Sequence, residues 1–599
     1  MHKSQEKKKL RLGYLIKNLS TFLAPYKWSF WGAIGMVVIT VIALVIAPSV
    51  EGMITTQLAK DAADLLNKVP GAGVQFGIIM KIIVVLISVY LVKTASQGVG
   101  IFLLTNAIQN AMFDLRGAVQ DKVRRLPVRY FDTQSYGDVL SRITNDIETM
   151  SNALQQTFTQ IVSGILMLIL AISMMFSIQP LMACIAILII PLSLLISKLV
   201  VKKSQKQFEA QQNAIGSLNG MITEIYTGYN EILLYNKQEE VIENFKEAND
   251  TLRQHAFKAQ FLSSLMSPLI SLVTYLVIGS VAVVGALFAL SGTITIGELQ
   301  AFIRYIWQVN DPISQVSQLS TQIQSACAAM ERVFEILDEE EEVKEVDDPV
   351  DVTHVEGRVV FENVVFGYNE QPVIQNLNIE IKPGQMVAIV GPTGAGKTTF
   401  INLLLRFYDV NSGRILIDGM DIRQMRRGDL RSLFGMVLQD TWLFSGSIYD
   451  NIRYGRLNAR KDEVIDAAKM ANVHHFIKTL PGGYNMEINE EGNNVSQGEK
   501  QLLTIARAIL KDPKILILDE ATSSVDTRLE KMIQTAMERI MKDRTSFVIA
   551  HRLSTIRNAD IILVMKDGSI VEHGNHDELI KQKGYYEQLY RSQFAEQDN

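Results

Sequence analysis

Long apolar runs constrain this chain most strongly. Six segments before about residue 330 are predominantly apolar, although Lys81 and Lys93 interrupt the second and Arg304 and Asp311 interrupt the sixth. A helix of roughly 20 apolar residues crosses the hydrocarbon core of a bilayer. The pattern therefore predicts about six membrane-spanning helices. These segments are residues 28–50, 78–104, 158–178, 181–200, 265–290 and 299 to about 316.

The connections between these runs predict how the chain crosses the membrane. Residues 105–157 and 201–258 are long, helical in pattern and rich in Lys and Arg. Basic loops stay on the cytoplasmic side, so both loops and both termini are expected in the cytoplasm, with the spanning helices continuing into it. Residues 12–27 carry apolar side chains at helical spacing. They fit an interfacial amphipathic helix better than a short soluble one.

Two features inside the spans have two interpretations each. Asp311, before Pro312, is an acid within the sixth run. It is either a functional residue or a residue that faces a water-filled cavity near the membrane edge. Four methionines could line an adaptable drug pocket, although packing or lipid contact is the favoured interpretation. They are Met167, Met174, Met175 and Met182.

The character of the chain changes near an acidic run at residues 338–342, which is typical of a solvated linker. We expect a transmembrane domain over residues 1–335, a linker over 336–356 and a nucleotide-binding domain over 357–599. The net charge of −5 gives no indication of a nucleic-acid partner. Two cysteines are too few for a disulfide framework or a structural zinc site.

A phosphate-binding loop stands in the second half of the chain. An apolar run at residues 386–390 reads as a buried strand, and residues 400–405 read as the start of a helix, which is the context that a P-loop requires. The glycines let backbone N–H groups surround phosphate oxygens. A glycine-rich turn that binds nothing is the alternative. The loop consists of Gly391, Pro392, Thr393, Gly394, Ala395, Gly396, Lys397, Thr398 and Thr399.

The loop's side chains, with an acid pair farther on, indicate nucleotide chemistry. Lys397 can reach the β- and γ-phosphates, and the Thr398 hydroxyl can ligate Mg²⁺. Four aliphatic residues precede Asp519 and Glu520, as in a Walker B strand. Asp519 can hold Mg²⁺, and Glu520 can orient or deprotonate the attacking water.

Further polar residues indicate nucleotide binding only when they are considered together with these motifs. Tyr368 could stack on an adenine ring, and Ser496 with Gly498 could hold a γ-phosphate at a helix start. His551 ends an apolar run, where it could contact the γ-phosphate, and Gln439 follows another such run. Each of them alone would more often be structural.

In this order, the set resembles the nucleotide-binding domain of an ATP-binding cassette (ABC) protein. The fusion to about six spans resembles a type IV ABC exporter half-transporter over nearly the full length. The implied fold is a membrane all-α six-helix transmembrane domain fused to an α/β P-loop ATP-binding cassette domain. The motifs are Tyr368, residues 391–399, Gln439, residues 496–498, Asp519, Glu520, residues 524–526 ending in Asp526, and His551. Residues 131–132, 137–138, 142 and 145–146 match the family's first cytoplasmic loop.

The resemblance implies a role for each motif. Two cassettes would dimerise head to tail around two ATP molecules, so that Ser496 and Gly498 serve the ATP on the partner's P-loop. Glu520 would be the catalytic base, Gln439 the sensor of Mg²⁺ and water, and His551 the γ-phosphate switch. Short helices near residues 132–137 and 226–231 would couple the cassettes to the spans.

One motif departs from the family pattern. The usual signature Leu-Ser-Gly-Gly-Gln is replaced by residues 495–499, which place Gln497 and Glu499 in two of its positions. In this family, some exporters are heterodimers with one weakened ATP site. A heterodimer with a second half-transporter is therefore favoured over a homodimer, although Ser496 and Gly498 would still allow a homodimer.

The expected function is an ATPase that exports amphipathic drugs or lipid-like molecules, with ATP and Mg²⁺ as cofactors. The expected location is the inner or cytoplasmic cell membrane, in contact with its lipids. A lipid flippase or peptide exporter with the same engine is the first alternative. A membrane regulator that senses ATP without transport is the second, and Glu520 argues for turnover instead.

Overall fold

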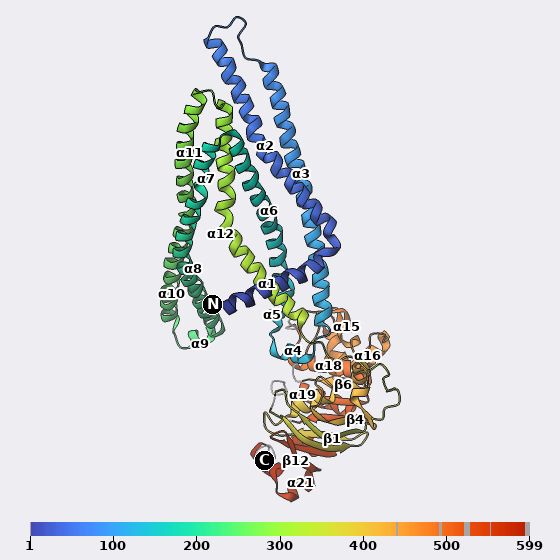
Figure 1. Cartoon of the computed structure of the whole chain (residues 1–599). Helices are drawn as coiled ribbons and strands as arrows, with labels where there is room; N and C mark the ends of the chain where they lie inside the picture. Colours follow the sequence, from blue (N-terminus) through green and yellow to red (C-terminus); the bar gives the residue numbers. More distant parts are fainter. Residues whose placement is uncertain are drawn as a thin grey trace. The chain divides into compact units, whose positions relative to one another are not determined.

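The computed structural model describes residues 2–369, 371–438, 441–489, 494–519, 527–550 and 553–593 (Figure 1). Its internal contacts divide the chain into two units. The first unit comprises Met1–Leu126 and Gln134–Glu341, and the second comprises Pro127–Thr133 and Glu342–Asn599. A short segment of the first cytoplasmic loop thus groups with the second unit. The boundaries expected from the sequence stay predictions.

The first unit is helical throughout its described elements. Its helices are long because the apolar runs continue into helix-forming sequence, and α2 and α12 continue through Pro48 and Pro312. They are α1 (His2–Leu23), α2 (Lys27–Leu66), α3 (Phe76–Val123), α5 (Tyr136–Ser141), α6 (Ile147–Ile178), α7 (Pro180–Ile187), α8 (Ile189–Thr227), α9 (Tyr229–Leu234), α10 (Gln238–Ser264), α11 (Met266–Leu290) and α12 (Ile296–Asp338), with a 3₁₀ turn η1 (Ala24–Tyr26) and a π-helical turn η2 (Arg142–Asp146).

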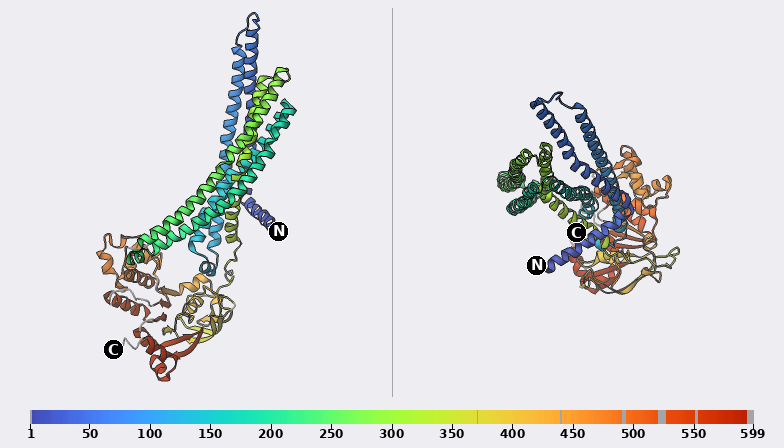
Figure 2. Two further views of the ribbon diagram at one scale, coloured as in Figure 1. Left: turned by 90° about the vertical axis from the view of Figure 1, so that its left-hand side faces the viewer. Right: turned by 45° about the horizontal axis from the view of Figure 1, so that its top comes forward.

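The long helices pack in pairs and bury a shared core. α2 lies along α3, α12 lies against α6 and α2, and α8 and α10 run side by side with α9 at their junction (Figure 2). All four methionines pack here: Met167, Met175 and Met182 are buried, and Met174 is partly buried. The interpretation of these four as packing residues agrees with the structure.

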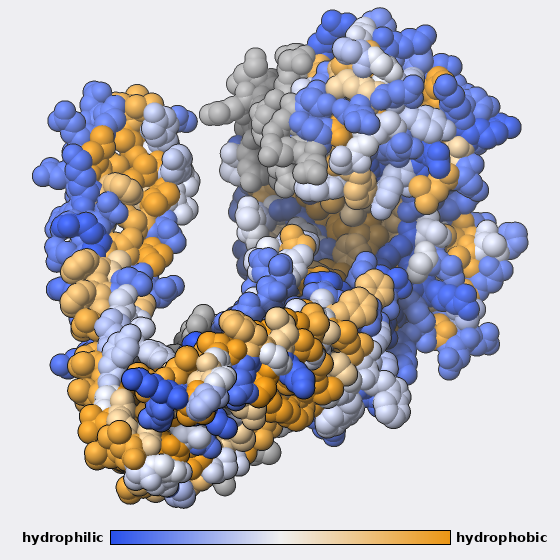
Figure 3. All heavy atoms as spheres, turned by 90° about the horizontal axis from the view of Figure 1, so that it is seen from above, coloured by the Kyte–Doolittle hydropathy of each residue, from blue (hydrophilic) through white to orange (hydrophobic). Residues whose placement is uncertain are grey.

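Among the residues that the structure describes, five helical stretches are long and apolar enough to cross a membrane. Together they contain the first five predicted spans, whereas the sixth span, within α12, stays a prediction. In the most apolar stretch of α3, only 6% of the residues are buried. Apolar side chains cover much of the helical surface in the lower part of the view in Figure 3. Such exposed apolar area is typical of helices that face lipid or a partner.

The second unit contains a mixed α/β fold. Strands β2, β1, β4 and β5 form an antiparallel sheet in that order, and β12, β11, β3, β10, β9 and β6 form a larger sheet. Within the larger sheet, β11, β3, β10, β9 and β6 pair in parallel, and β12 pairs antiparallel at one edge. The strands are β1 (Val359–Phe366), β2 (Ile374–Ile381), β3 (Met386–Val390), β4 (Ser412–Ile417), β5 (Met420–Asp421), β6 (Phe434–Val437), β7 (Gly446–Ser447), β8 (Glu487–Ile488), β9 (Ile515–Asp519), β10 (Thr545–Ile549), β11 (Ile561–Lys566) and β12 (Ser569–Gly574).

Helices cover these sheets and divide the core into clusters. One cluster joins both sheets to α13, and another joins the larger sheet to α18 and α19. The helices are α4 (Val128–Thr133), α13 (Lys397–Leu404), α14 (Arg427–Ser432), α15 (Ile448–Arg453), α16 (Lys461–Met470), α17 (His474–Thr479), α18 (Gln497–Lys511), α19 (Thr527–Met541), α20 (Leu553–Arg557), α21 (His576–Gln582) and α22 (Tyr585–Gln593), with 3₁₀ turns η3 (Ile422–Gln424) and η4 (Gly483–Asn485).

Candidate nucleotide-binding site

The predicted phosphate loop connects β3 to α13, as the sequence indicates. Gly394 and Gly396 have φ angles of 84° and 101°, in the left-handed region that a residue without a Cβ enters at no cost. Gly396 precedes the first residue of α13 directly. The unpaired N–H groups at the start of this helix therefore face the loop, where they can bind an anion.

Lys397 places its ammonium group within this loop. Its Nζ donates hydrogen bonds to the carbonyl oxygens of Gly391 at 2.7 Å and Pro392 at 3.0 Å. Burial lowers the pKa of Lys397, and the Asp519 carboxylate opposes that shift. Burial penalises the charged form of this lysine. An incoming phosphate would attract the ammonium group and offset that penalty.

The parallel sheet brings Asp519 to the same edge as the phosphate loop. Ile549 of the central strand β10 pairs with Ile389 of β3 on one side and with Asp519 of β9 on the other. Asp519 therefore ends its strand at the level where β3 enters the loop. Thr398 is exposed at the start of α13. The Thr398 hydroxyl and the Asp519 carboxylate are the oxygen ligands that Mg²⁺ prefers, so this part of the predicted metal set fits the ion.

Tyr368 lies beside the loop. Its hydroxyl is 3.2 Å from the hydroxyl of Thr399, which is buried in the first turn of α13. The Tyr368 ring packs edge-on against Phe366 and Tyr408, with 5.0 Å between ring centroids in each pair. The structure thus brings Tyr368 and the P-loop together, although the adenine contact itself stays a prediction.

The signature residues lie at the start of α18, within the other large core cluster of this unit. Val495 is buried in that cluster, Gly498 is buried and Ser496 is exposed. Glu499 accepts hydrogen bonds from the Ser496 backbone N–H at 2.9 Å and from the Ser496 hydroxyl at 2.6 Å. The sequence shows that Glu499 replaces a signature residue, but the hydrogen bond between its carboxylate and the Ser496 hydroxyl was not predicted. A capping-box pattern, Ser followed three residues later by Glu, could have indicated this.

Four predicted site residues lie outside the described parts of the chain. They are Gln439, Glu520, Asp526 and His551. Their roles stay predictions.

The sequence predicts a short coupling helix near residues 132–137, and α4 ends at Thr133; the side chain that this helix contacts was not predicted. The Tyr408 hydroxyl donates a hydrogen bond to the Asp132 carboxylate. Burial and this neighbouring carboxylate raise the pKa of Tyr408, which keeps the hydroxyl protonated as a donor. Asp132 and Tyr408 both belong to the second unit, so this bond holds α4 to the rest of that unit.

Two family models match the chain. The ABC transporter transmembrane region matches residues 30–313, and the ABC transporter model matches residues 374–523. A fatty acid ABC transporter ATP-binding/permease protein of Mycobacterium bovis is 48% identical over 534 residues, which cover 88% of this chain and 84% of that protein. The chain belongs to the ABC transporter family. It is an exporter half-transporter, a membrane protein whose ATPase activity is coupled to transport.

Other relatives agree with this assignment. The ATP-dependent lipid A-core flippase of Syntrophus aciditrophicus is 35% identical over 511 residues, covering 85% of this chain and 85% of that protein. The structure of a bacterial Atm1-family ABC exporter with ATP bound superposes with a TM-score of 0.72 at 29% identity, covering 95% of this chain and 99% of that one. The transporter therefore has the membrane-plus-cassette fold expected from its sequence, with the ATP-binding domain in the cytoplasm.

Proposed function

We propose that this transporter is one half of a dimeric exporter of the inner or cytoplasmic membrane that moves amphipathic drugs or lipid-like molecules outward by alternating access. The observation that carries the proposal is the half-buried Lys397 ammonium inside the P-loop, in a chain whose long helices expose apolar surface. Relatives named a fatty acid transporter and a lipid A-core flippase support a lipid-like substrate.

In this proposal, ATP lies along the P-loop at the start of α13. Lys397 and the loop N–H groups hold its phosphates, and Tyr368 contacts the adenine ring. Thr398, Gln439 and Asp519 hold Mg²⁺, which supplies positive charge at the phosphate oxygens when bound. Glu520 would activate the attacking water, His551 would act as the γ-phosphate switch, and Asp526 would contribute to nucleotide binding.

A second half-transporter completes each site. The P-loop helix α13 and the signature helix α18 pack in different core clusters of one chain. The exposed Ser496 is then available to an ATP on the partner's P-loop. The altered signature, with Glu499 bound to Ser496, favours a heterodimer in which this chain contributes a weaker signature.

The energetics require ATP to bind the two conformations with different affinity, because otherwise it could not shift their populations. In the closed dimer, both halves neutralise the triphosphate charge. Hydrolysis removes the γ-phosphate contacts, so that the two cassettes of the closed dimer separate. The long helices carry this change to the membrane, so that the two states open to opposite sides.

The test uses the complex purified with its second subunit and placed in lipid nanodiscs. Glu520→Gln is expected to keep ATP binding and to lower hydrolysis at its own site by about 100-fold or more, because it removes a general base. Lys397→Ala is expected to weaken ATP binding itself, whereas Lys382→Ala, at an exposed lysine of the same unit, should not. Normal hydrolysis by Glu520→Gln at the only strong site would refute the assignment of Glu520.

A further inference from the structure

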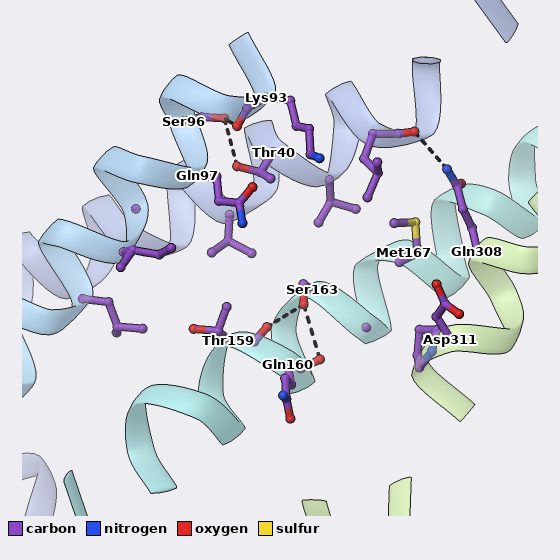
Figure 4. A pocket seen from close by; sticks show the side chains of 18 residues that line it. Thr40, Lys93, Ser96, Gln97, Thr159, Gln160, Ser163, Met167, Gln308 and Asp311 are labelled. Carbon is purple, nitrogen blue, oxygen red and sulfur yellow. Dashed lines mark hydrogen bonds between the residues drawn. The ribbon is translucent and has the colours of Figure 1, made fainter. Parts of the chain in front are cut away.

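A cavity of about 450 Å³ lies within the helical unit, between α2, α3, α6 and α12 (Figure 4). This volume lies within the range of about 300–1,000 Å³ that is typical of small-molecule sites. Its apolar wall includes Val37, Val41 and Leu44 of α2 and Met167 of α6. Met167 packs in the same core as the other three methionines and also lines this cavity, whereas the other three do not line it.

Most polar groups around the cavity already have partners in the protein. Thr40 and Ser96 share a hydrogen bond of 2.9 Å, and Ser163 donates to the carbonyl of Thr159 at 2.6 Å. The amide nitrogen of Gln308 donates to the carbonyl of Leu44 at 3.0 Å. These groups form part of the wall. Because they already form hydrogen bonds within the protein, they offer few free donors to a ligand.

Lys93 and Gln97 differ from those groups. They are one helical turn apart on α3, on the same face, and Figure 4 shows both side chains extending into the same open space. Within the described residues, neither the Lys93 ammonium nor the Gln97 amide forms a hydrogen bond or ion pair. A cation in an apolar run is costly without a partner and points to a function. Gln97 adds an N–H donor beside it.

Asp311 makes the charge of the cavity wall differ between the α12 side and the α3 side. It lies across the open space from Lys93, beside Met167 (Figure 4). Asp311 therefore lines a cavity, as one of its two interpretations expected, and a functional role for Asp311 stays a prediction. Its carboxylate repels an anion from the α12 side, whereas Lys93 attracts one to the α3 side. The amide oxygen of Gln308, buried on the α12 side without a partner in the described structure, is an acceptor and also disfavours an anion there.

We infer that this cavity binds an amphipathic anion, whose carboxylate or phosphate headgroup pairs with Lys93 and Gln97 while its tail lies along the apolar α2 wall. The inference rests on the proposed transport function and narrows its substrate class. Neutral amphiphiles with the same tail lack the charge-assisted hydrogen bond to Lys93. Lys93 is then the residue that sets specificity for the anionic headgroup.

The test compares four probes with one tail: oleate, oleyl phosphate, oleyl alcohol and oleylamine. Equilibrium binding of each is measured to the purified complex in nanodiscs of neutral lipid, after subtraction of binding to empty nanodiscs. We expect oleate, oleyl phosphate or both to bind about tenfold more tightly than oleyl alcohol, as one charge-assisted hydrogen bond would give. The stronger of the two anions identifies the headgroup.

Variants assign the preference to Lys93. Lys93→Gln should abolish the preference for the anion over the alcohol, and Lys93→Arg should retain it. Lys81→Gln is the matched control, since Lys81 is on the same helix but outside the cavity wall. An unchanged preference in Lys93→Gln, equal binding of all probes, or tightest binding of oleylamine would overturn the inference.

ATP hydrolysis by the same samples separates the two proposals. A Lys93-dependent anion preference in a complex that never hydrolyses ATP would support the binding site and refute the exporter. Hydrolysis without any headgroup preference would leave the exporter standing and overturn the anion site.

Discussion

Replacing Glu499 tests whether the unusual signature restrains nucleotide binding. The Glu499 carboxylate accepts two hydrogen bonds from Ser496, from the backbone N–H at 2.9 Å and from the hydroxyl at 2.6 Å. A hydroxyl has one proton to donate. Ser496 must therefore leave Glu499 before it can donate to a phosphate.

The size of the effect follows from these two bonds. A hydrogen bond to a charged group contributes about 1.5–3 kcal/mol, whereas a neutral one contributes about 0.5–1.5 kcal/mol. Glu499→Gln keeps the shape of the capping box, which accepts either residue, but its neutral amide holds the hydroxyl less tightly by about 1 kcal/mol. We therefore expect ATP to bind roughly fivefold more tightly to the site that this signature serves. Removal of a negative charge near the γ-phosphate acts in the same direction.

In the assay, ATP is titrated into the purified complex, and both the rate of ATP turnover and the nucleotide occupancy of the sites are measured. Occupancy is needed because, in a heterodimer, the affected site can be the one with slow turnover. Glu578→Gln is the matched control, since Glu578 makes the same kind of capping contact with Asn575 at the start of α21. Unchanged or weaker ATP binding in Glu499→Gln, or an equal gain in Glu578→Gln, would refute the reasoning.

Two further substitutions test the packing of the nucleotide-binding unit. Gly568→Ala should lower the unit's Tm by about 4–8 °C, or about 2 kcal/mol, because φ is 79° and an added Cβ would lie 1.9 Å from the carbonyl oxygen of Val373. Tyr408→Phe should roughly halve the stimulation of ATP hydrolysis by substrate, because it removes the hydrogen bond to Asp132 and leaves one fewer tie between α4 and the cassette.

Each of these variants has a control in the same unit. Gly384→Ala carries similar strain at φ of 77° but meets no atom within 4 Å, so its Tm in thermal unfolding should fall by roughly half as much. Tyr484→Phe removes a hydroxyl that is 2.7 Å from His474 Nδ1 and should leave substrate stimulation as it is. Equal losses in a variant and its control would contradict the proposed role of the contact.

Features encoded within a short stretch of chain were readable from the sequence. Residues 386–390 are wholly apolar and form the buried strand β3, and the glycines after them adopt the left-handed backbone that the loop requires. The apolar runs likewise form helices that continue into the basic loops. Strand, turn and helix preferences act over a few residues, so one stretch of sequence suffices to predict them.

Contacts between distant stretches were decided by the tertiary structure alone. Lys93, Met167 and Asp311 line one cavity from three different helices, and Lys93 and Asp311 are more than 200 residues apart in the sequence. Tyr408 and Asp132, which form a hydrogen bond, are 276 residues apart. No local pattern encodes such meetings, because they depend on how whole helices and strands pack. The sequence determined that this chain has spans and a phosphate loop, whereas packing decided which side chains face the cavity and which join α4 to the cassette.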